Sequence, residues 1–568
     1  MGNTNWKSFD KVVRRAVGKH QSYVSGRQSR GRMSALEEAY SEYRVEKQYP
    51  LALTEAGMKI TFVQSENENL AFEYFSALLR ARGHAVELAY DHRYFARTGV
   101  RLPKIARYFD ERDMLVKRIV DGRPDLVAFS VMTSSYQWAL DMARRIKRRC
   151  DTPIIFGGVH VSSVPAVAIK EEAVDMVCVG EGEESFMSLI DQFESYPAVE
   201  IPGIWTKVEG QVREQEPARL LMDLDTLPFP DKEIFYDELP WLSTGYLIMT
   251  SRGCPYSCTY CCNDTMRKIA KGKGQYVRRR SVDNVIEEMK EAKRHYNPKL
   301  FNIMDDCFTA DKSWLREFCS RYHKEVDIPF ISTSHPSVVG DEVASLLARA
   351  GCMAVLIGVQ STSEESRNKI LNRKETNDQI RSAVEACHRH GLKLSIDHIF
   401  GIPGEGKEEY RNALRFYDEL QPDVINTFWL VYFPRTTIVE HGLTAGILSP
   451  DDVGSINRGE LDLAMNVGIG GQKRKKSSEF YNYAFLYSLI PLLPRRVMDL
   501  IVDKGAYLDE WSPPIALTLA LRMISLMKLG EPRVYLERAL EILIGFLKSA
   551  LRIARDRIVD SAVSRRSY

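Results

Sequence analysis

Three cysteines on one short segment carry the clearest chemical signal in this sequence. Cys254, Cys258 and Cys261 have C-x3-C-x2-C spacing and directly follow the apolar run 246–250. Three thiolates can bind three irons of a [4Fe–4S] cluster and leave the fourth iron open, whereas a cluster that only carries electrons has four cysteine ligands. The spacing therefore predicts a cluster whose open iron can hold a substrate.

A zinc site is the alternative, since the chain has ten Cys. A structural zinc ion would need a fourth Cys or His at matching spacing, and Cys262 is too close behind Cys261 to complete a tetrahedron comfortably. The iron–sulfur interpretation is therefore favoured.

The cysteine motif resembles that of the radical S-adenosylmethionine (radical SAM) superfamily, which also has an aromatic residue before the last cysteine, here Tyr260. The resemblance implies that the open iron binds the methionine end of SAM and that electron transfer cleaves SAM to a 5′-deoxyadenosyl radical. It also implies an external electron donor, such as a flavodoxin or a ferredoxin.

Composition sets outer bounds on the protein. The 568 residues are enough for two or three domains, and the net charge of +2 indicates no particular partner. The cysteines show no extracellular disulfide framework, and the amino terminus lacks an apolar signal core. No uncharged stretch reaches the about 18 to 20 apolar residues that span a bilayer. We expect a cytoplasmic protein.

Strand-like runs alternate with helical stretches over residues 57–200, after a basic arm at 1–56. This alternation predicts an α/β fold with a doubly wound, Rossmann-like (flavodoxin-like) parallel sheet. Ligands of such sheets bind at the carboxyl ends of the strands. The predicted strands are 59–63, 85–89, 125–130, 153–158 and 176–180.

Small and polar residues follow three of these strands and resemble the cobalamin-binding domain that precedes the radical SAM barrel in one large subfamily. They are Ser130, Thr133, Gly157, Gly158, His160, Gly180, Glu181 and Gly182. The resemblance implies that the serine and the paired glycines line the channel for the dimethylbenzimidazole tail of cobalamin. The alternative is a flavodoxin-like domain without cobalamin, since many such domains share these features.

The sequence departs from corrinoid proteins that bind cobalt through a histidine. Those proteins have D-x-H-x-x-G after the first strand, whereas residues 64–69 read QSENEN here. His92 follows the second strand without the glycine spacing, and we interpret it as a surface residue. His160 is a candidate for approaching the corrin, although a structural, hydrogen-bonding role is more common in such a loop.

Residues 201–245 are predicted to be a linker, because their Pro-punctuated stretch 223–231 cannot continue a helix. A second series of six strand-like runs, alternating with helices, follows over 246–445. Six βα units suggest the partial (β/α)6 barrel that radical SAM enzymes share, with chemistry at the strands' carboxyl ends. The predicted strands are 246–250, 300–304, 330–333, 354–358, 393–400 and 424–431.

Residues after three barrel strands resemble the family's SAM-binding motifs. Asp305 and Asp306 stand where the family contacts the amino group of SAM, and carboxylates suit an ammonium group. Gln360 and Ser361 stand where many relatives have Glu-Ser, so the ribose contact loses its charge but keeps its hydrogen-bonding capacity. Ile402, within 401–405, belongs to an element that packs beside the adenine.

Residues 446–568 are predicted to form a helical domain with a basic run at 473–476 and apolar helices at 515–529 and 534–555. One interpretation is a cap on the barrel mouth. The other is a basic amphipathic surface that touches a membrane peripherally and receives an apolar substrate, such as an isoprenoid lipid or a tetrapyrrole. The aromatic residues that could line a pocket or fill a core are Tyr481, Tyr483, Phe485, Tyr487 and Trp511.

These features predict a cobalamin-dependent radical SAM enzyme acting on a small molecule, such as a lipid, a tetrapyrrole or a natural-product intermediate. The favoured reaction is methylation of an unactivated carbon by the 5′-deoxyadenosyl radical and methylcobalamin. The alternatives are ring formation or oxidation without methyl transfer, as in the anaerobic magnesium-protoporphyrin monomethyl ester cyclases, and a non-catalytic corrinoid and iron–sulfur binding protein. No nucleic-acid partner is expected, since the basic segment 268–280 is better interpreted as a solvated face or a cap.

Overall fold

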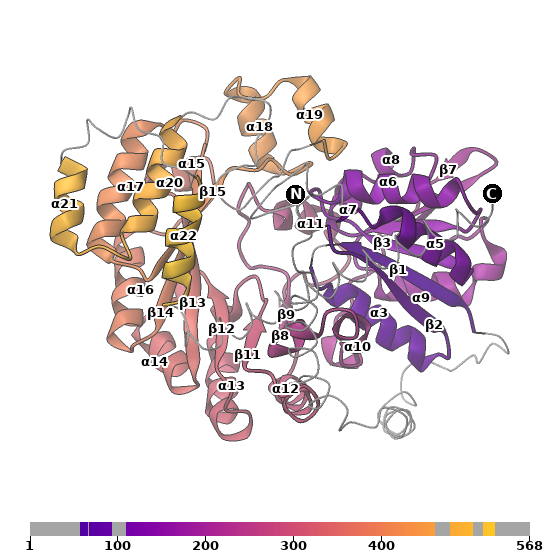
Figure 1. Cartoon of the computed structure of the whole chain (residues 1–568), viewed down its shortest axis with the longest axis horizontal. Helices are drawn as coiled ribbons and strands as arrows, with labels where there is room; N and C mark the ends of the chain where they lie inside the picture. Colours follow the sequence, from indigo (N-terminus) through magenta and orange to yellow (C-terminus); the bar gives the residue numbers. More distant parts are fainter. Residues whose placement is uncertain (1–56, 66, 94–108, 461–477, 504–514, 529–568) are drawn as a thin grey trace, which may run out of the picture. The chain divides into compact units, whose positions relative to one another are not determined.

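The computed structural model describes residues 57–65, 67–93, 109–460, 478–503 and 515–528. Among these residues, all but Gly57 and 80–84 group into one compact unit, which contains both large sheets of Figure 1. The predicted basic arm at 1–56 lies outside the described residues.

The first sheet has five parallel strands in the order β2-β1-β3-β4-β5. They are β1 (Lys59–Ser65), β2 (Ala85–Asp91), β3 (Leu126–Ser130), β4 (Ile154–Gly157) and β5 (Met176–Cys178). Alternate residues face opposite sides: Phe62 packs in the core with α3 (Leu70–Ala81) and α9 (Glu183–Asp191), and Val63 with α5 (Arg112–Gly122) and α6 (Tyr136–Lys147). Helices on both faces confirm the doubly wound fold.

A hairpin that the sequence analysis did not anticipate extends this sheet. β6 (Ile204–Val208) runs antiparallel to β5, and β7 (Gln211–Arg213) runs antiparallel to β6. Both strands lie within 201–245, the predicted linker. The turn contains Gly210 at φ +77°, a backbone conformation that favours glycine. All three residues of β7 are exposed, so no alternation of apolar residues marked it.

The second sheet has six parallel strands in sequence order, from β8 to β15. They are β8 (Gly245–Ile248), β11 (Leu300–Ile303), β12 (Phe330–Ser334), β13 (Cys352–Gln360), β14 (Lys393–Phe400) and β15 (Val424–Trp429). The intervening helices α12 (Val282–His295), α13 (Lys312–Glu325), α14 (Asp341–Arg349), α16 (Asn377–Arg389) and α17 (Lys407–Leu420) pack on one side. The predicted partial (β/α)6 barrel is confirmed.

Two carboxyl-terminal helices cover opposite faces of the last barrel strands. α20 (Ser478–Leu489) packs Tyr487 against His398, Phe400 and Tyr417, on the side of α17. α22 (Ile515–Leu526) packs Leu526 against Ala354 and Val424, which face the opposite side. α20 is therefore a sixth outer helix rather than a cap on the barrel mouth. Tyr483, Phe485 and Tyr487 are buried core residues, and Trp511 lies outside the described residues.

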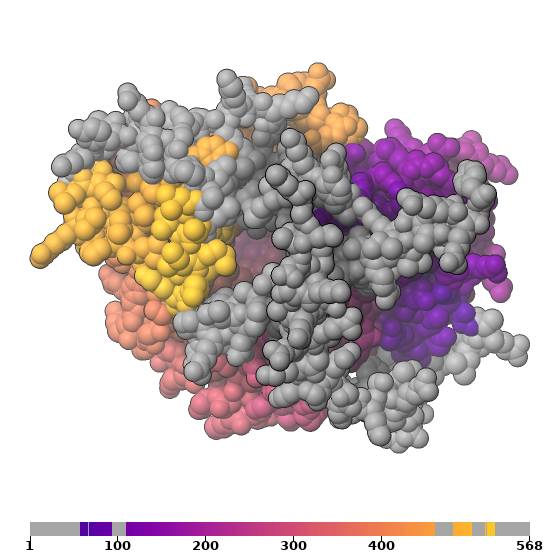
Figure 2. Space-filling model, in the orientation of Figure 1, coloured from indigo at the N-terminus to yellow at the C-terminus, as the bar shows by residue number. Residues whose placement is uncertain are grey.

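The predicted membrane contact of the carboxyl-terminal region is tested only in part by the described residues. Within the described ranges, no helix has both the length and the apolar character needed to cross a membrane. α21 (Arg495–Asp503) and α22, at the orange and yellow end of the colours in Figure 2, expose Leu500, Met523 and Ile524. The basic run 473–476 and the segment 534–555 lie outside the described residues.

Candidate functional site

The cysteines lie on the loop between β9 (Ser251–Arg252) and α11 (Cys262–Ile269), just after the first barrel strand. All three are free thiols. Gly253 opens the loop at φ +79°, and a side chain there would meet the Tyr276 carbonyl oxygen at 2.3 Å. Glycine is thus required where the chain turns into the cluster motif.

A guanidinium and an amide side chain donate hydrogen bonds to two of the cysteine sulfurs. Arg373 Nη1 lies 3.6 Å from Cys258 Sγ, and Asn263 Nδ2 lies 3.7 Å from Cys261 Sγ. Burial raises the pKa of Cys254 to about 12, whereas the hydrogen bond from the Cys262 thiol is the main cause that lowers the pKa of Cys261 to about 7. Thiolates that bind iron would be stabilised by such donors.

The residues present fit a [4Fe–4S] cluster. Within the described parts of the chain, no three His, Cys, Asp or Glu side chains converge closely enough to hold a single metal ion. A cubane cluster makes a different demand, because each cysteine binds a separate iron atom. When bound, this cluster with SAM supplies a radical that can abstract a hydrogen atom.

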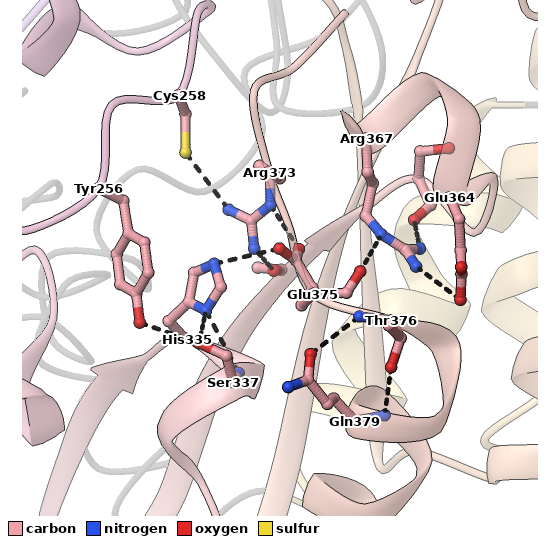
Figure 3. A network of polar contacts seen from close by, with 12 residues as sticks. Tyr256, Cys258, His335, Ser337, Glu364, Arg367, Arg373, Glu375, Thr376 and Gln379 are labelled. Atoms are coloured by element: carbon pink, nitrogen blue, oxygen red, sulfur yellow. Dashed lines mark hydrogen bonds and ion pairs between the residues drawn. The ribbon is translucent and has the colours of Figure 1, made fainter. Parts of the chain in front are cut away.

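A buried polar network contacts the cluster loop through Tyr256 and Cys258 (Figure 3). Arg373 donates to Glu375 at 2.6 Å and to the Gly358 carbonyl oxygen at 2.6 Å. Glu375 also pairs with His335 at 3.4 Å, and the His335 ring stacks on Tyr256 of the cluster loop with centroids 3.8 Å apart. Burial alone would raise the pKa of Glu375, but His335 and Arg373 together lower it to about 2. The carboxylate therefore stays charged and orients both partners.

The two aspartates after β11 have different surroundings. Asp305 is buried and accepts hydrogen bonds from the backbone N–H and hydroxyl groups of Thr250 and Ser251, at 2.6 to 3.2 Å. It fastens β8 and β9 to β11, and both of its oxygens have protein partners. Asp306 instead lines a cavity, and burial raises the pKa of its carboxyl. Of the two predicted contacts to the amino group of SAM, Asp306 has the accessible carboxylate.

The other predicted SAM residues surround the end of β13. Gln360 has φ +68° at an irregularity in the β13–β14 pairing, and its side chain folds over Gly358. Ser361 is buried and donates to Glu405, whose pKa is raised to about 7 by burial. Ile402 is buried in an apolar cluster against which Tyr260 packs. The structure thus brings Ile402 and Tyr260 together, and pairs Ser361 with a carboxyl that the sequence analysis did not single out.

A cavity of about 400 Å³ opens at the carboxyl ends of the strands of the first sheet. Its walls come from three groups of residues. The predicted cobalamin residues in the wall are Ser130, Gly157, Gly158, Gly180, Glu181 and Gly182. The aromatic wall contains Phe62, Phe72, Tyr74, Phe75, Phe129 and Phe186. Residues beside the cluster motif complete it: Met249, Ser251, Arg252, Gly253, Met304 and Asp306.

Two glycines of this cavity wall are required by contacts within the protein. A side chain at Gly158 would meet the backbone of Val131 at 2.6 Å, and one at Gly182 would meet the Phe75 ring at 2.9 Å. The aromatic wall is suited to an apolar ring such as the tail of cobalamin. The residues present therefore fit cobalamin, which supplies a transferable methyl group when bound.

Thr133 and His160 do not belong to the residues that line this cavity. His160 is buried, its Nδ1 lies 3.0 Å from Thr133 Oγ1, and its ring packs on Tyr136. Burial lowers the pKa of His160 to about 4, so the imidazole is neutral at neutral pH. This geometry favours the structural alternative for His160.

The interpretation of His92 as a surface residue is wrong. Its side chain is only 2% exposed, and its Nδ1 lies 3.2 Å from a carboxylate oxygen of Glu111. Glu111 directly precedes α5, so His92 helps to hold the end of β2 against that helix. Its sequence neighbours contain no pattern that indicates burial.

Family models match both domains. Residues 60–190 match the B12 binding domain and residues 248–417 match the radical SAM superfamily, together more than half of the chain. An uncharacterized methyltransferase, PH0819, of Pyrococcus horikoshii is 28% identical over 59% of this chain and 72% of that protein. A cytidylyl-2-hydroxyethylphosphonate methyltransferase of Streptomyces wedmorensis is 26% identical over 67% and 79%. An anaerobic magnesium-protoporphyrin IX monomethyl ester cyclase of Synechocystis is 26% identical over 56% and 64%.

The solved structure of the cobalamin-dependent S-adenosylmethionine radical enzyme OxsB with aqua-cobalamin bound has a similar fold. Its TM-score is 0.59 at 16% identity, and the match covers 89% of this chain and 81% of that one. With a B12-binding domain followed by a radical SAM domain, which imply cobalamin, a [4Fe–4S] cluster and SAM, the chain belongs to the cobalamin-binding radical SAM enzymes.

Proposed function

We propose that the protein methylates an unactivated carbon of a small-molecule substrate. The observation that supports this most directly is the single cavity whose wall combines the cobalamin-side strand ends with residues beside the cluster motif. Transfer of a methyl group to a substrate radical requires the two cofactors to face one shared space. Two of the relatives described above are methyltransferases by name.

In this proposal the chain's own residues bind and orient. Cys254, Cys258 and Cys261 hold the cluster, and Asp306 binds the amino group of SAM. Gln360 serves the ribose, and Ile402 packs beside the adenine together with Tyr260. Among the cobalamin-side residues, the glycines give backbone access to the corrinoid and the aromatic wall excludes water from its tail.

The experiment is an anaerobic reconstitution with iron, sulfide and hydroxocobalamin, followed by incubation with SAM, a strong reductant and a panel of small molecules. We expect both S-adenosylhomocysteine and 5′-deoxyadenosine, and a product heavier by one CH2 unit. Cys258→Ala should abolish formation of 5′-deoxyadenosine. SAM cleavage that persists in this variant would contradict the cluster assignment.

The second candidate function is ring formation or oxidation without methyl transfer. Similarity to the magnesium-protoporphyrin cyclase favours it. It predicts 5′-deoxyadenosine with a product that gains no CH2 unit and with no stoichiometric S-adenosylhomocysteine, so the same incubation separates the two reactions.

A further inference from the structure

Two arginines face each other across the ribbon that carries the cluster loop. β9 pairs antiparallel with β10 (Arg278–Arg279), and Arg252 is the direct partner of Arg278 in this pairing. Cys254 follows Arg252 by two residues, so the ribbon anchors the start of the cluster motif. Like charges directly opposite each other destabilise a strand pair. This ribbon therefore depends on counter-charges.

The counter-charges come from the B12-binding domain. Arg278 donates to both carboxylate oxygens of Glu181, at 2.5 and 2.8 Å, and Arg252 donates to Glu183 at 2.6 Å. The side chains are largely shielded from solvent: Arg278 and Glu181 are 3% and 23% exposed, and Arg252 and Glu183 are 12% and 11% exposed. The Arg278–Glu181 pair is bidentate, and a bidentate, partly shielded pair is stronger and more geometrically specific than an ion pair in water.

Three of these four side chains, Glu181, Glu183 and Arg252, line the cavity. Glu181 stands between Gly180 and Gly182 on the cobalamin side, and Arg252 stands next to Gly253 on the cluster side. Arg252 also lies over the ring of Tyr74, another residue of the wall, at 5.9 Å from its centroid. A shift of the loop 180–182 and the adjoining Glu183 would therefore displace both Arg252 and Arg278.

We propose that Glu181 and Glu183 are positioning residues that couple the two cofactor sites: they hold the cluster loop in register with the cobalamin cavity. The inference rests on the cofactor assignments of the proposed function. It also changes the expected role of Glu181, because Arg278 occupies both oxygens of the carboxylate that the sequence analysis assigned to cobalamin. Coupling of this kind is reciprocal, so each cofactor favours binding of the other.

The test measures the affinity of the full-length protein for hydroxocobalamin, by absorbance, with and without the reconstituted cluster. In the wild type we expect tighter binding when the cluster is present, by at least about five-fold, the lower end for coupled sites. In the double variant Glu181→Gln, Glu183→Gln, this ratio should fall toward one. Glu184→Gln, on the exposed neighbour in α9, should keep the wild-type ratio.

A second variant and a second readout complete the test. Arg278→Lys keeps the charge but loses the bidentate geometry. Its ratio of hydroxocobalamin affinities with and without the cluster should lie between one and the wild-type ratio. If the double variant does not fold, this variant tests the coupling in its place. The electron paramagnetic resonance spectrum of the reduced cluster should respond to cobalamin in the wild type and not in the double variant.

A wild-type ratio of one, or an unchanged ratio in the folded double variant, would overturn the inference. The proposed function fails on a different result, the absence of a methylated product. Coupled cofactor binding without methylation would therefore leave this inference standing.

Discussion

The guanidinium of Arg373 places a full positive charge beside a cluster ligand, since its Nη1 donates to Cys258 Sγ at 3.6 Å. Reduction adds an electron to the cluster, and a nearby cation with a hydrogen bond to sulfur favours that more negative state. We expect Arg373→Gln to lower the reduction potential of the cluster, and Arg373→Lys to remain closer to the wild type. A redox titration followed by electron paramagnetic resonance checks this. Equal potentials in all three proteins would contradict it.

Glu405 gives the same site a pH-dependent stability. Burial raises its pKa from 4.5 to about 7, so the folded protein binds more protons than the unfolded chain between these values. Its contribution to stability is therefore present below pH 4.5 and lost as the pH rises through about 7. Compared with the wild type, Glu405→Gln should gain thermal stability at pH 8.5 relative to pH 5.5. Exposed Glu408→Gln is the control, and a pH-independent difference would refute the argument.

Single residues also show where prediction from sequence ends. Asp305 and Asp306 are neighbours of the same type. Only the tertiary hydrogen bonds from Thr250 and Ser251 show that Asp305 is structural, whereas Asp306 lines the cavity. Arg373 lies in a segment without a recognisable pattern, 112 residues after Cys261 along the chain. Its hydrogen bond to Cys258 could not be predicted from the spacing of residues in the sequence.

At the scale of elements, the turn from β4 into α7 (Val159–Ser163) depends on one glycine. Gly158 has φ +94° and ψ 177°, and a side chain there would lie 2.6 Å from the Val131 backbone nitrogen. We expect Gly158→Ala to destabilise the fold by about 1–3 kcal/mol and to weaken cobalamin binding. Gly340→Ala is the control, because a side chain there would meet nothing within 4 Å and Gly340 is not among the residues that line the cavity. Denaturant titration measures the free energy of unfolding of both variants, and an equal loss of stability in the two would contradict this account.

Elements with a continuous apolar run were predicted well. All six barrel strands and the five parallel strands of the first sheet occur close to their expected bounds, because buried parallel strands are apolar on both faces. The β6–β7 hairpin was missed because one of its strands is fully exposed. The position of α20 beside α17 was not predicted, since its sequence indicates burial but not which element it packs against.

At the scale of the whole molecule, a buried charge network joins three parts of the chain. Lys232 Nζ lies 2.8 Å from Glu68, 2.7 Å from Glu73 and 2.8 Å from the carbonyl oxygen of Leu247 in β8. The Lys232 side chain is 0% exposed. It thus ties the first domain, the connecting segment and the barrel together.

Removal of this lysine should therefore affect the entire unit. We expect Lys232→Met to cost about 3–5 kcal/mol, because two carboxyl groups would lose their buried cation. The additional change Glu73→Gln should recover part of the loss, and Met at the exposed Lys299 should change stability by less than about 0.5 kcal/mol. Urea unfolding measures these values. A loss confined to one domain would contradict a network that spans both.

The cavity with two sources of wall residues also has a consequence for biosynthesis. The last residue of its aromatic wall, Phe186, leaves the ribosome about 120 residues before Met304 and Asp306. At ordinary rates of translation this interval is roughly 6 to 24 seconds. During this time the nascent B12-binding domain exposes its aromatic wall without its covering half. Cobalamin that binds during this interval would meet the aromatic wall before Met304 and Asp306 are in place.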